Sequence, residues 1–319
     1  MITYYKTAED QMMKQVEQAE VGTGAWIKVI DPTESEIESL SKQYDIPKTY
    51  FFDALDSEER SRIEMKHVEE SFTHSLVIVE TPYQTSDELG YAMFETLPIG
   101  IIVTQEIILT ISLKENPITN HILYSKDDHF DTKNHIQFLL QMLYTVSSYF
   151  LKDLYKLISM MNKLEGEIKQ AMKNEQLYAF MAVQKSLVFF ATALQSNKAI
   201  LDKMKDSEHF TENQLDHDLL RDVMIENKQA IAMTDTYTQI ISGMSDVFSS
   251  VISNNLNIVM KFLASFTIIL SLPTIIGSIY GMNVKLPFMH DRFAFTGIMI
   301  FTFVITACVT VIFWRRKYF

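Results

Sequence analysis

Hydrophobic and polar positions divide the chain into a first part with short alternating runs and a second part with helical spacing. The alternating or β-branched runs predict strands, with the turn residues Gly90 and Pro98 among them, at 25–30, 75–80, 92–96, 100–104 and 107–112. Asp31-Pro32-Thr33-Glu34 predicts a helix start, because a capping residue precedes a proline and an acid. Residues 1–130 are therefore predicted to form an α/β domain.

The next part of the chain has the periodicity of long helices. Apolar residues such as Leu139, Leu143 and Val146 recur at steps of three and four, which predicts a helical pair within 131–210 whose apolar stripe is helix–helix core. A new helix is expected to begin at Thr211-Glu212-Asn213 and to continue to Tyr280. At the standard rise, these 70 residues measure roughly 105 Å, so the helix would stand as a stalk before it reaches a membrane.

Two charge-free runs near the carboxyl end are long enough to cross a bilayer. Phe262–Val284 has 23 residues and Phe293–Trp314 has 22. The short connection places both ends of this hairpin on one side of the membrane. Basic residues flank the hairpin and make that side the cytoplasm by the positive-inside rule, although Lys285 and Arg292 in the connection weaken the contrast. The flanking residues are Lys261, Arg315, Arg316 and Lys317.

The resulting division has a cytoplasmic stalk helix that continues into the first span over 211–281, an external connection over 282–292, a second span over 293–314 and a basic tail over 315–319. The polar amino terminus has no apolar segment of the kind that marks a signal peptide. We therefore expect a multi-pass protein of the plasma (inner) membrane with both termini in the cytoplasm.

The charge balance argues against several functions. The formal net charge is −12, and it combines −17 over 1–259 with +5 from Met260 onward, so a nucleic-acid partner is not expected. The one cysteine, Cys308, lies in the second span, which leaves no intrachain disulfide. No H-E-x-x-H or G-x-x-x-x-G-K-[ST] motif occurs, so we expect no enzyme and no bound cofactor.

A stripe of mostly small polar residues follows one face of the long helix into the first span. Steps of three and four keep its members on one side. Two interpretations stay open on the stripe alone: packing between helices and the lining of a pore. The stripe comprises Asp246, Ser250, Ser253, Asn257, Met260, Leu263, Thr267, Ser271, Thr274 and Ser278.

The stripe ends at Tyr280-Gly281-Met282-Asn283, which resembles the signature of the CorA family of divalent-cation transporters. The segment Asn257–Leu263 resembles that family's approach to the membrane. Asp53-Ala54-Leu55-Asp56, followed by Glu59–Glu64, resembles its amino-terminal domain. The resemblance covers essentially the whole chain and favours the pore interpretation of the stripe.

The resemblance implies a homopentameric funnel: an α+β cytoplasmic domain, a long helical stalk and two carboxyl-terminal transmembrane helices. It implies that Asn283 selects the ion, that Gly281 and Met282 shape the filter loop, and that Asp222 shares a regulatory Mg²⁺ with an acidic residue of a neighbouring copy. The expected cargo is hydrated Mg²⁺, with Co²⁺ and Ni²⁺ as further ions, moving down the electrochemical gradient under control by intracellular Mg²⁺.

Two alternatives remain. The connection VKLPFMHDR has few acids, with Asp291 and His290 as its only cation attractors, so a zinc transporter of the same superfamily is the first alternative. The second is a membrane-anchored scaffold or sensor, whose hairpin only tethers the acidic domain and which would tolerate loss of Asn283.

Overall fold

The computed structural model describes residues 1–8, 12–68, 71–125, 130–170, 174–211, 213–287, 292–316 and 318. The chain divides into two compact units, Met1–Ile241 and Ser242–Phe319, and each is described by itself. The long helix α6 (Gln214–Tyr280) contributes residues to both units.

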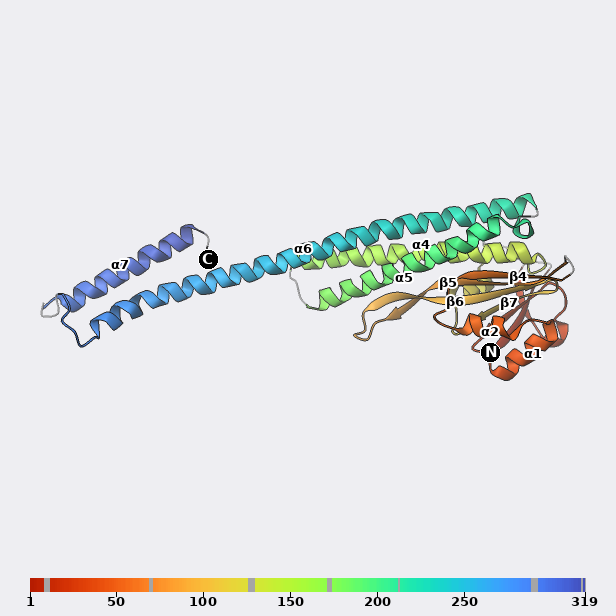
Figure 1. Cartoon of the computed structure of the whole chain (residues 1–319), viewed down its shortest axis with the longest axis horizontal. Coiled ribbons are helices and arrows are strands. Elements are labelled where there is room, and N and C mark those ends of the chain that lie inside the picture. Colours follow the sequence, from red (N-terminus) through yellow and green to blue (C-terminus); the bar gives the residue numbers. More distant parts are fainter. Residues whose placement is uncertain are drawn as a thin grey trace. The chain divides into compact units, whose positions relative to one another are not determined.

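The first unit is built around a mixed sheet of seven strands in the order β2-β1-β3-β7-β6-β5-β4 (Figure 1). β3 and β7 are parallel, and every other neighbouring pair in this sheet is antiparallel. The strands are β1 (Ile2–Thr7), β2 (Met13–Val16), β3 (Ala25–Ile30), β4 (Arg62–Val68), β5 (Ser71–Ser86), β6 (Ala92–Thr104) and β7 (Ile107–Ser112).

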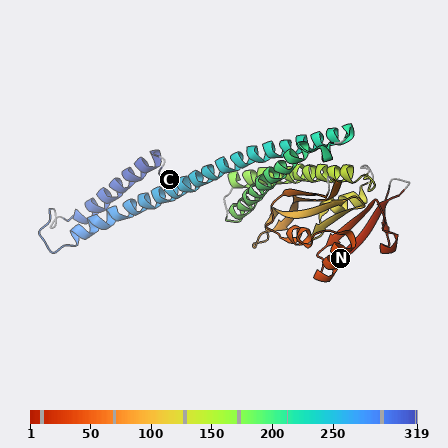
Figure 2. The same cartoon turned by 45° about the vertical axis from the view of Figure 1, so that its right-hand side comes forward.

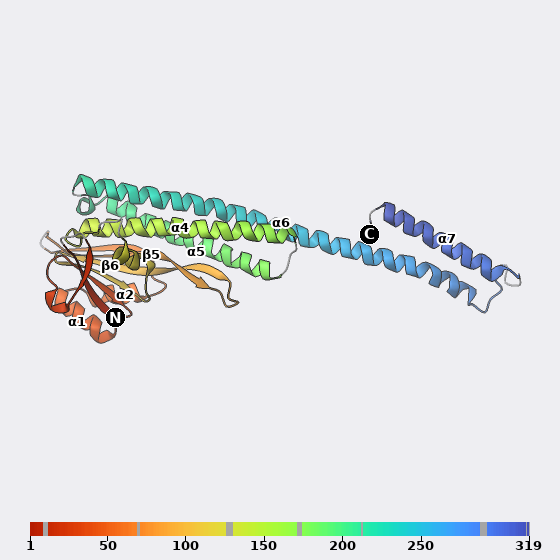
Figure 3. The same cartoon turned by 180° about the vertical axis from the view of Figure 1, so that it is seen from behind.

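Helices cover both faces of this sheet, as Figures 1 and 3 show from opposite sides. α1 (Glu34–Tyr44) and α2 (Lys48–Leu55) pack on one face, where Ile27 and Val29 of β3 join their core. α4 (His135–Gln170) and α5 (Asn174–Lys205) lie on the other face. There Trp26, the residue between Ala25 and Ile27 in β3, packs against Phe138 of α4 in a tilted arrangement with ring centroids 5.5 Å apart. The alternation along β3 thus supplies both cores.

Short helices and caps close the unit. α3 (Pro117–Tyr124) begins with proline in its first turn, behind the capping side chain of Asn116. The predicted helix start at residue 31 was placed two residues too early: Thr33 is the cap of α1, and its hydroxyl and the Glu36 carboxylate form a reciprocal capping box. Asp31 instead has a positive φ of 44° between β3 and this helix.

One predicted turn is wrong. Pro98 lies inside β6, so the runs at 92–96 and 100–104 are a single strand. Pairing of β6 with β7 covers only Gly100–Val103, which leaves Pro98 with a partner strand on the β5 side alone. A proline is tolerated there because a ladder hydrogen bond is missing on one side in any case.

The first part of α6 packs onto α5 and does not stand alone (Figure 2). Its buried residues recur at steps of three and four, the spacing of a coiled-coil seam. Asn213 caps the helix, since its Oδ1 accepts from the backbone N–H of Asp216 at 2.9 Å. The predicted stalk helix is therefore packed against α5 along this part of its length. The seam comprises Leu220, Val223, Asn227, Ala230, Thr234 and Ile241.

The second unit consists of the rest of α6 and of α7 (Ala294–Arg315), which runs back beside it in Figures 1 and 3. Among the described helices, α5, α6 and α7 are long and apolar enough to span a membrane. They differ in burial: the most apolar 18-residue segment of each is 44%, 6% and 0% buried, respectively. Because α5 packs on the sheet, its apolar residues belong to the core. The exposed apolar surfaces of α6 and α7 require lipid or further protein.

Candidate functional site

The end of α6 is the first element of the candidate site. The backbone N–H of Gly281 donates to the Gly277 carbonyl oxygen at 3.0 Å, and the N–H of Met282 donates to Ile279 at 3.2 Å. The chain then turns away from the helix through Asn283 and Val284. A Cβ at position 281 would lie 3.3 Å from the Gly277 oxygen one turn back along the same helix, which is a tight contact.

The polar stripe lies on α6 as its periodicity predicted, and within this chain nine of its members are exposed and Ser271 is half-buried. Three hydroxyls of the stripe inside the apolar run donate to the helix itself: Thr267 to Leu263 at 2.8 Å, Ser271 to Ile268 at 2.9 Å and Thr274 to Leu270 at 3.1 Å. With its proton held by the backbone, each oxygen presents lone pairs outward. The exposed face is therefore a row of hydrogen-bond acceptors.

The lower part of the stripe changes in character. Ser250 donates to the carbonyl of Asp246 at 3.0 Å, which leaves the Asp246 carboxylate itself exposed. Met260 and Leu263 follow with 56% and 55% of their surfaces accessible, an apolar interval between polar positions. Along one helix face the order is thus carboxylate, small polar groups, apolar side chains, hydroxyls and finally the Gly281–Asn283 turn.

Asp222 lies elsewhere, on an exposed position of α6 within the first unit. The buried seam residue Val223 follows it, so the carboxylate lies outside the packed core. Among the described residues, no group of three or more His, Cys, Asp or Glu side chains could hold a metal ion.

The basic residues that flank the hairpin are placed in part. Lys261 is exposed on α6, Arg315 ends α7 and Arg316 caps it. Lys317, His290 and Asp291 lie outside the described residues, and so does the zinc contact suggested for His290.

Two features of the first unit were absent from the sequence interpretation. The first is Glu80 on β5: burial raises the pKa of its carboxyl group from the ordinary 4.5 to about 7, against an opposing hydrogen bond from Thr96. The second is a pocket between α5 and α6 whose lining includes Lys205, Arg221 and Lys228. Neither has a local motif, because both depend on segments that are distant in the chain.

Comparison with known proteins identifies the architecture. The family model described as CorA-like Mg²⁺ transporter protein matches residues 22–317. The chain is 26% identical over 295 residues to the cobalt/magnesium transport protein CorA of Methanocaldococcus jannaschii, with 91% of this chain and 90% of that protein covered.

Solved structures agree in fold. The complete structure of the CorA magnesium transporter from Methanocaldococcus jannaschii has a TM-score of 0.79 at 22% identity and covers 100% of this chain and 99% of its own. The cytoplasmic domain of ZntB from Vibrio parahaemolyticus has a TM-score of 0.54 at 13% identity, covering 76% of this chain and 97% of its own. At these identities the likeness concerns the fold alone.

Proposed function

Because the chain belongs to the CorA family of divalent-cation transporters, a family of channels and transporters and not of enzymes, we propose that it forms a homopentameric channel for hydrated Mg²⁺ in the plasma membrane. The observation that carries this proposal is the exposed acceptor face of α6, which ends directly at the Gly281–Asn283 turn. Both termini lie in the cytoplasm in this proposal, as the basic residues around the hairpin favour.

The acceptor face fits the chemistry of the cargo. Mg²⁺ releases its water ligands reluctantly, and those bound waters donate hydrogen bonds outward. The Thr267, Ser271 and Thr274 oxygens already have their protons engaged by backbone carbonyls, so they are available to accept from such waters. A lining of neutral acceptors holds a hydrated ion without the tight binding that a fixed negative charge would cause.

Several copies are needed to make a pore. One helix cannot enclose a channel, and the exposed polar face of α6 is disfavoured against lipid, so the face must turn toward an axis shared by neighbouring copies. The number five comes from the family resemblance. Around this axis Asn283 forms the selecting ring, supported by Gly281 and Met282, and Asp246 forms a ring of carboxylates at the inner entrance.

Closure is proposed at the apolar interval. Rings of Met260 and Leu263 would exclude water when they approach the axis, and an ion that retains its hydration shell cannot pass a dry constriction. Residues 1–259 of each copy carry a net charge of −17, so neighbouring copies repel one another. Intracellular Mg²⁺ bound between Asp222 and an acid of the next copy would relieve this repulsion. Binding would thereby favour the closed assembly.

Transport then needs no chemical energy source. A membrane potential of 100 mV draws a divalent cation inward with about 4.6 kcal/mol, twice the value for a single charge. The CorA-like description favours Mg²⁺, and Co²⁺ and Ni²⁺ are proposed as further cargo of the same filter. Lys285, the charged residue next after Asn283, opposes the concentration of cations at the outer mouth.

Flux into liposomes that hold the purified full chain tests the proposal. Mg²⁺, Co²⁺, Ni²⁺ and Zn²⁺ are offered in turn, with and without a pH gradient. We expect Mg²⁺ uptake that is driven by the membrane potential and is independent of the pH gradient. Uptake of Zn²⁺ alone would support the zinc transporter instead, and absence of any flux would support the scaffold.

A further inference from the structure

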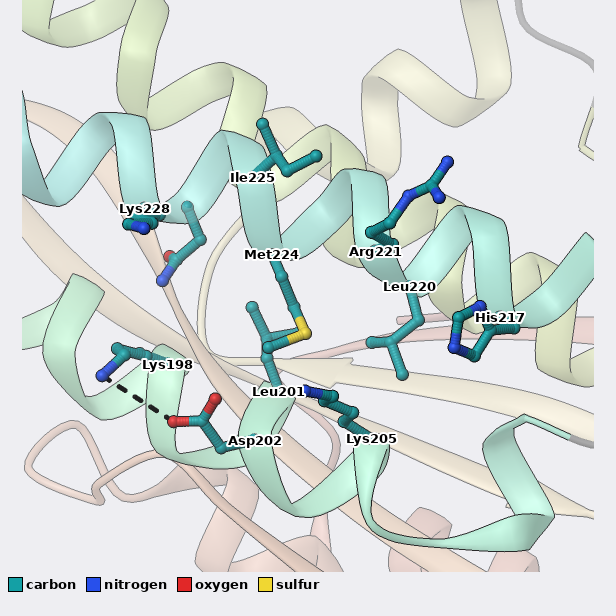
Figure 4. Close-up of a pocket in the computed structure, with 11 residues that line it drawn as sticks. Lys198, Leu201, Asp202, Lys205, His217, Leu220, Arg221, Met224, Ile225 and Lys228 are labelled. Atoms are coloured by element: carbon teal, nitrogen blue, oxygen red, sulfur yellow. Dashed lines mark ion pairs between the residues drawn. The ribbon is translucent and has the colours of Figure 1, made fainter.

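A pocket of about 480 Å³ lies between α5 and the first part of α6, inside the first unit (Figure 4). Its floor is apolar: Leu201 comes from α5, and Leu220 and Met224 come from α6. In Figure 4 these three side chains point toward one another across the space between the two helices. The volume is within the range of sites that bury a drug-sized organic molecule.

The rim of the pocket is cationic. Lys198 and Lys205 line it from α5, and Arg221 and Lys228 line it from α6, against the single carboxylate of Asp202. This concentration of positive charge occurs although residues 1–259 carry a net charge of −17. An anion is therefore drawn to this part of the first unit, whereas the acidic remainder of the surface repels it.

Two of the four cationic side chains form ion pairs within the described part of the chain, and two do not. Lys198 pairs with Asp202 at 3.8 Å, and Arg221 pairs with Asp218 at 3.5 Å. Lys205 and Lys228 form no ion pair with any described residue. They line the pocket from opposite helices and lie toward opposite ends of it in Figure 4, so an anionic group at either end can contact an unpaired ammonium group.

A buried polar atom adds a directional requirement. Asn227 also lines the pocket and is only 2% exposed. Its Nδ2 donates to the Leu194 carbonyl at 3.3 Å, but its Oδ1 has no hydrogen-bond partner in the described part of the chain. A buried acceptor without a donor is costly, so a ligand that brings a hydroxyl or N–H group would relieve that cost.

We propose that this pocket binds an amphipathic organic anion: an aromatic or alicyclic body on the apolar floor, a carboxylate or phosphate group at Lys205 or at Lys228, and a hydrogen-bond donor for Asn227. Such a ligand bridges α5 and α6 and favours the packed arrangement of the α6 seam. None of the residues that line the pocket belongs to the proposed ion path.

Equilibrium dialysis with the full chain in lipid nanodiscs tests the proposal, with empty nanodiscs subtracted. The probe is 6-hydroxy-2-naphthoate, which combines an aromatic body, a carboxylate and a hydroxyl donor. Saturable binding of one probe per chain is expected. 2-Naphthol, which lacks the carboxylate, and 2-naphthoate, which lacks the donor, should both bind more weakly.

The double variant Lys205→Gln/Lys228→Gln should weaken binding of the probe by about tenfold or more, because the charged contact is lost at whichever end of the pocket the carboxylate occupies. Lys203→Gln removes an exposed lysine of the same helix outside the pocket and should leave binding unchanged. The proposal is overturned if no saturable binding is found, as when a neighbouring copy fills the pocket. Equal binding of 2-naphthol, or equal affinity of the double variant, would overturn it as well.

Discussion

Asn197 of α5 hydrogen-bonds both backbone groups of Glu80 on β5: its Nδ2 donates to the Glu80 carbonyl at 2.9 Å, and its Oδ1 accepts from the Glu80 N–H at 3.0 Å. The amide thus replaces a neighbouring strand at this position and fixes the helix to the sheet. The Glu80 carboxyl group is itself partly buried. Its Oε2 has no hydrogen-bond partner in the described structure and no contact with solvent.

We expect the stability of the first unit to fall as pH rises from 4.5 to about 7 because of Glu80. Burial raises the pKa of this carboxyl group from 4.5 to about 7, so the folded state holds the proton more tightly than the unfolded state does. The protonated form is present in both states below pH 4.5, and the penalty of burying the charge develops between pH 4.5 and 7. By linkage it reaches about 3 kcal/mol at most.

Glu80→Gln removes this charge at every pH. The variant should gain stability over the unmodified chain at pH 8 and show little gain at pH 4.5, measured by thermal unfolding followed by circular dichroism. Glu88→Gln changes an exposed acid in the turn between β5 and β6 and should show no such pH-dependent difference. A gain for Glu80→Gln that is the same at both pH values would contradict the titration argument.

We expect Gly281→Ala to reduce ion flux strongly while the protein still assembles. The added methyl group would lie 3.3 Å from the Gly277 oxygen, closer than most Cβ contacts, so the end of α6 must adjust by a few tenths of an ångström. Because Asn283 follows two residues later, the shift displaces the proposed filter. A loss of tenfold or more in liposome Mg²⁺ uptake is expected, on the rough scale that a small misplacement of a site has.

Gly243→Ala is the matched control. It lies within α6, and a Cβ there meets nothing within 4 Å. The change should stabilise the helix by about 0.5–1 kcal/mol without lowering flux. If both alanine variants lose flux equally, helix stiffness and not the Gly277–Gly281 contact controls the channel.

We expect Asn283→Ala to abolish divalent uptake, since it removes the amide oxygen that accepts from the hydrated ion at the proposed filter. The control Asn255→Ala removes an exposed amide of α6 that lies two residues from Ser253 and thus on the opposite helix face. Uptake should be unchanged in this control. Normal uptake by Asn283→Ala, with normal assembly, would favour the scaffold interpretation.

The sequence predicted most of what forms from local patterns. Five strand segments lie within β3, β5, β6 and β7, and the end of α6 at Tyr280 follows from Gly281. β1 was not predicted, because its residues are half-buried and it pairs with strands on both sides without strict alternation. The Pro98 turn was wrong because only the register with β7 reveals that the proline needs no partner on that side.

The candidate site, like the fold, was predictable only where it depends on local sequence patterns. The polar stripe lies on one helix, so periodicity alone gave its face, but the direction of each hydroxyl proton required coordinates. The packing of the first part of α6 on α5 was missed, since the interpretation followed the polar face and not the seam that includes Val223 and Ala230. The pocket with Lys205 and Lys228 was beyond sequence reasoning because it combines two helices.

The final prediction concerns regulation. If intracellular Mg²⁺ closes the channel through Asp222, Asp222→Ala should raise the Mg²⁺ concentration required for closure severalfold, because an exposed carboxylate that ligates a divalent ion contributes charge and an oxygen. The measurement is efflux or current through reconstituted protein while Mg²⁺ on the cytoplasmic side is varied. Asp235→Ala removes an equally exposed acid of α6 and separates a specific site from a general decrease in repulsion. An unchanged Mg²⁺ dependence in Asp222→Ala would remove this residue from the mechanism, whereas equal shifts in both variants would assign regulation to the total negative charge.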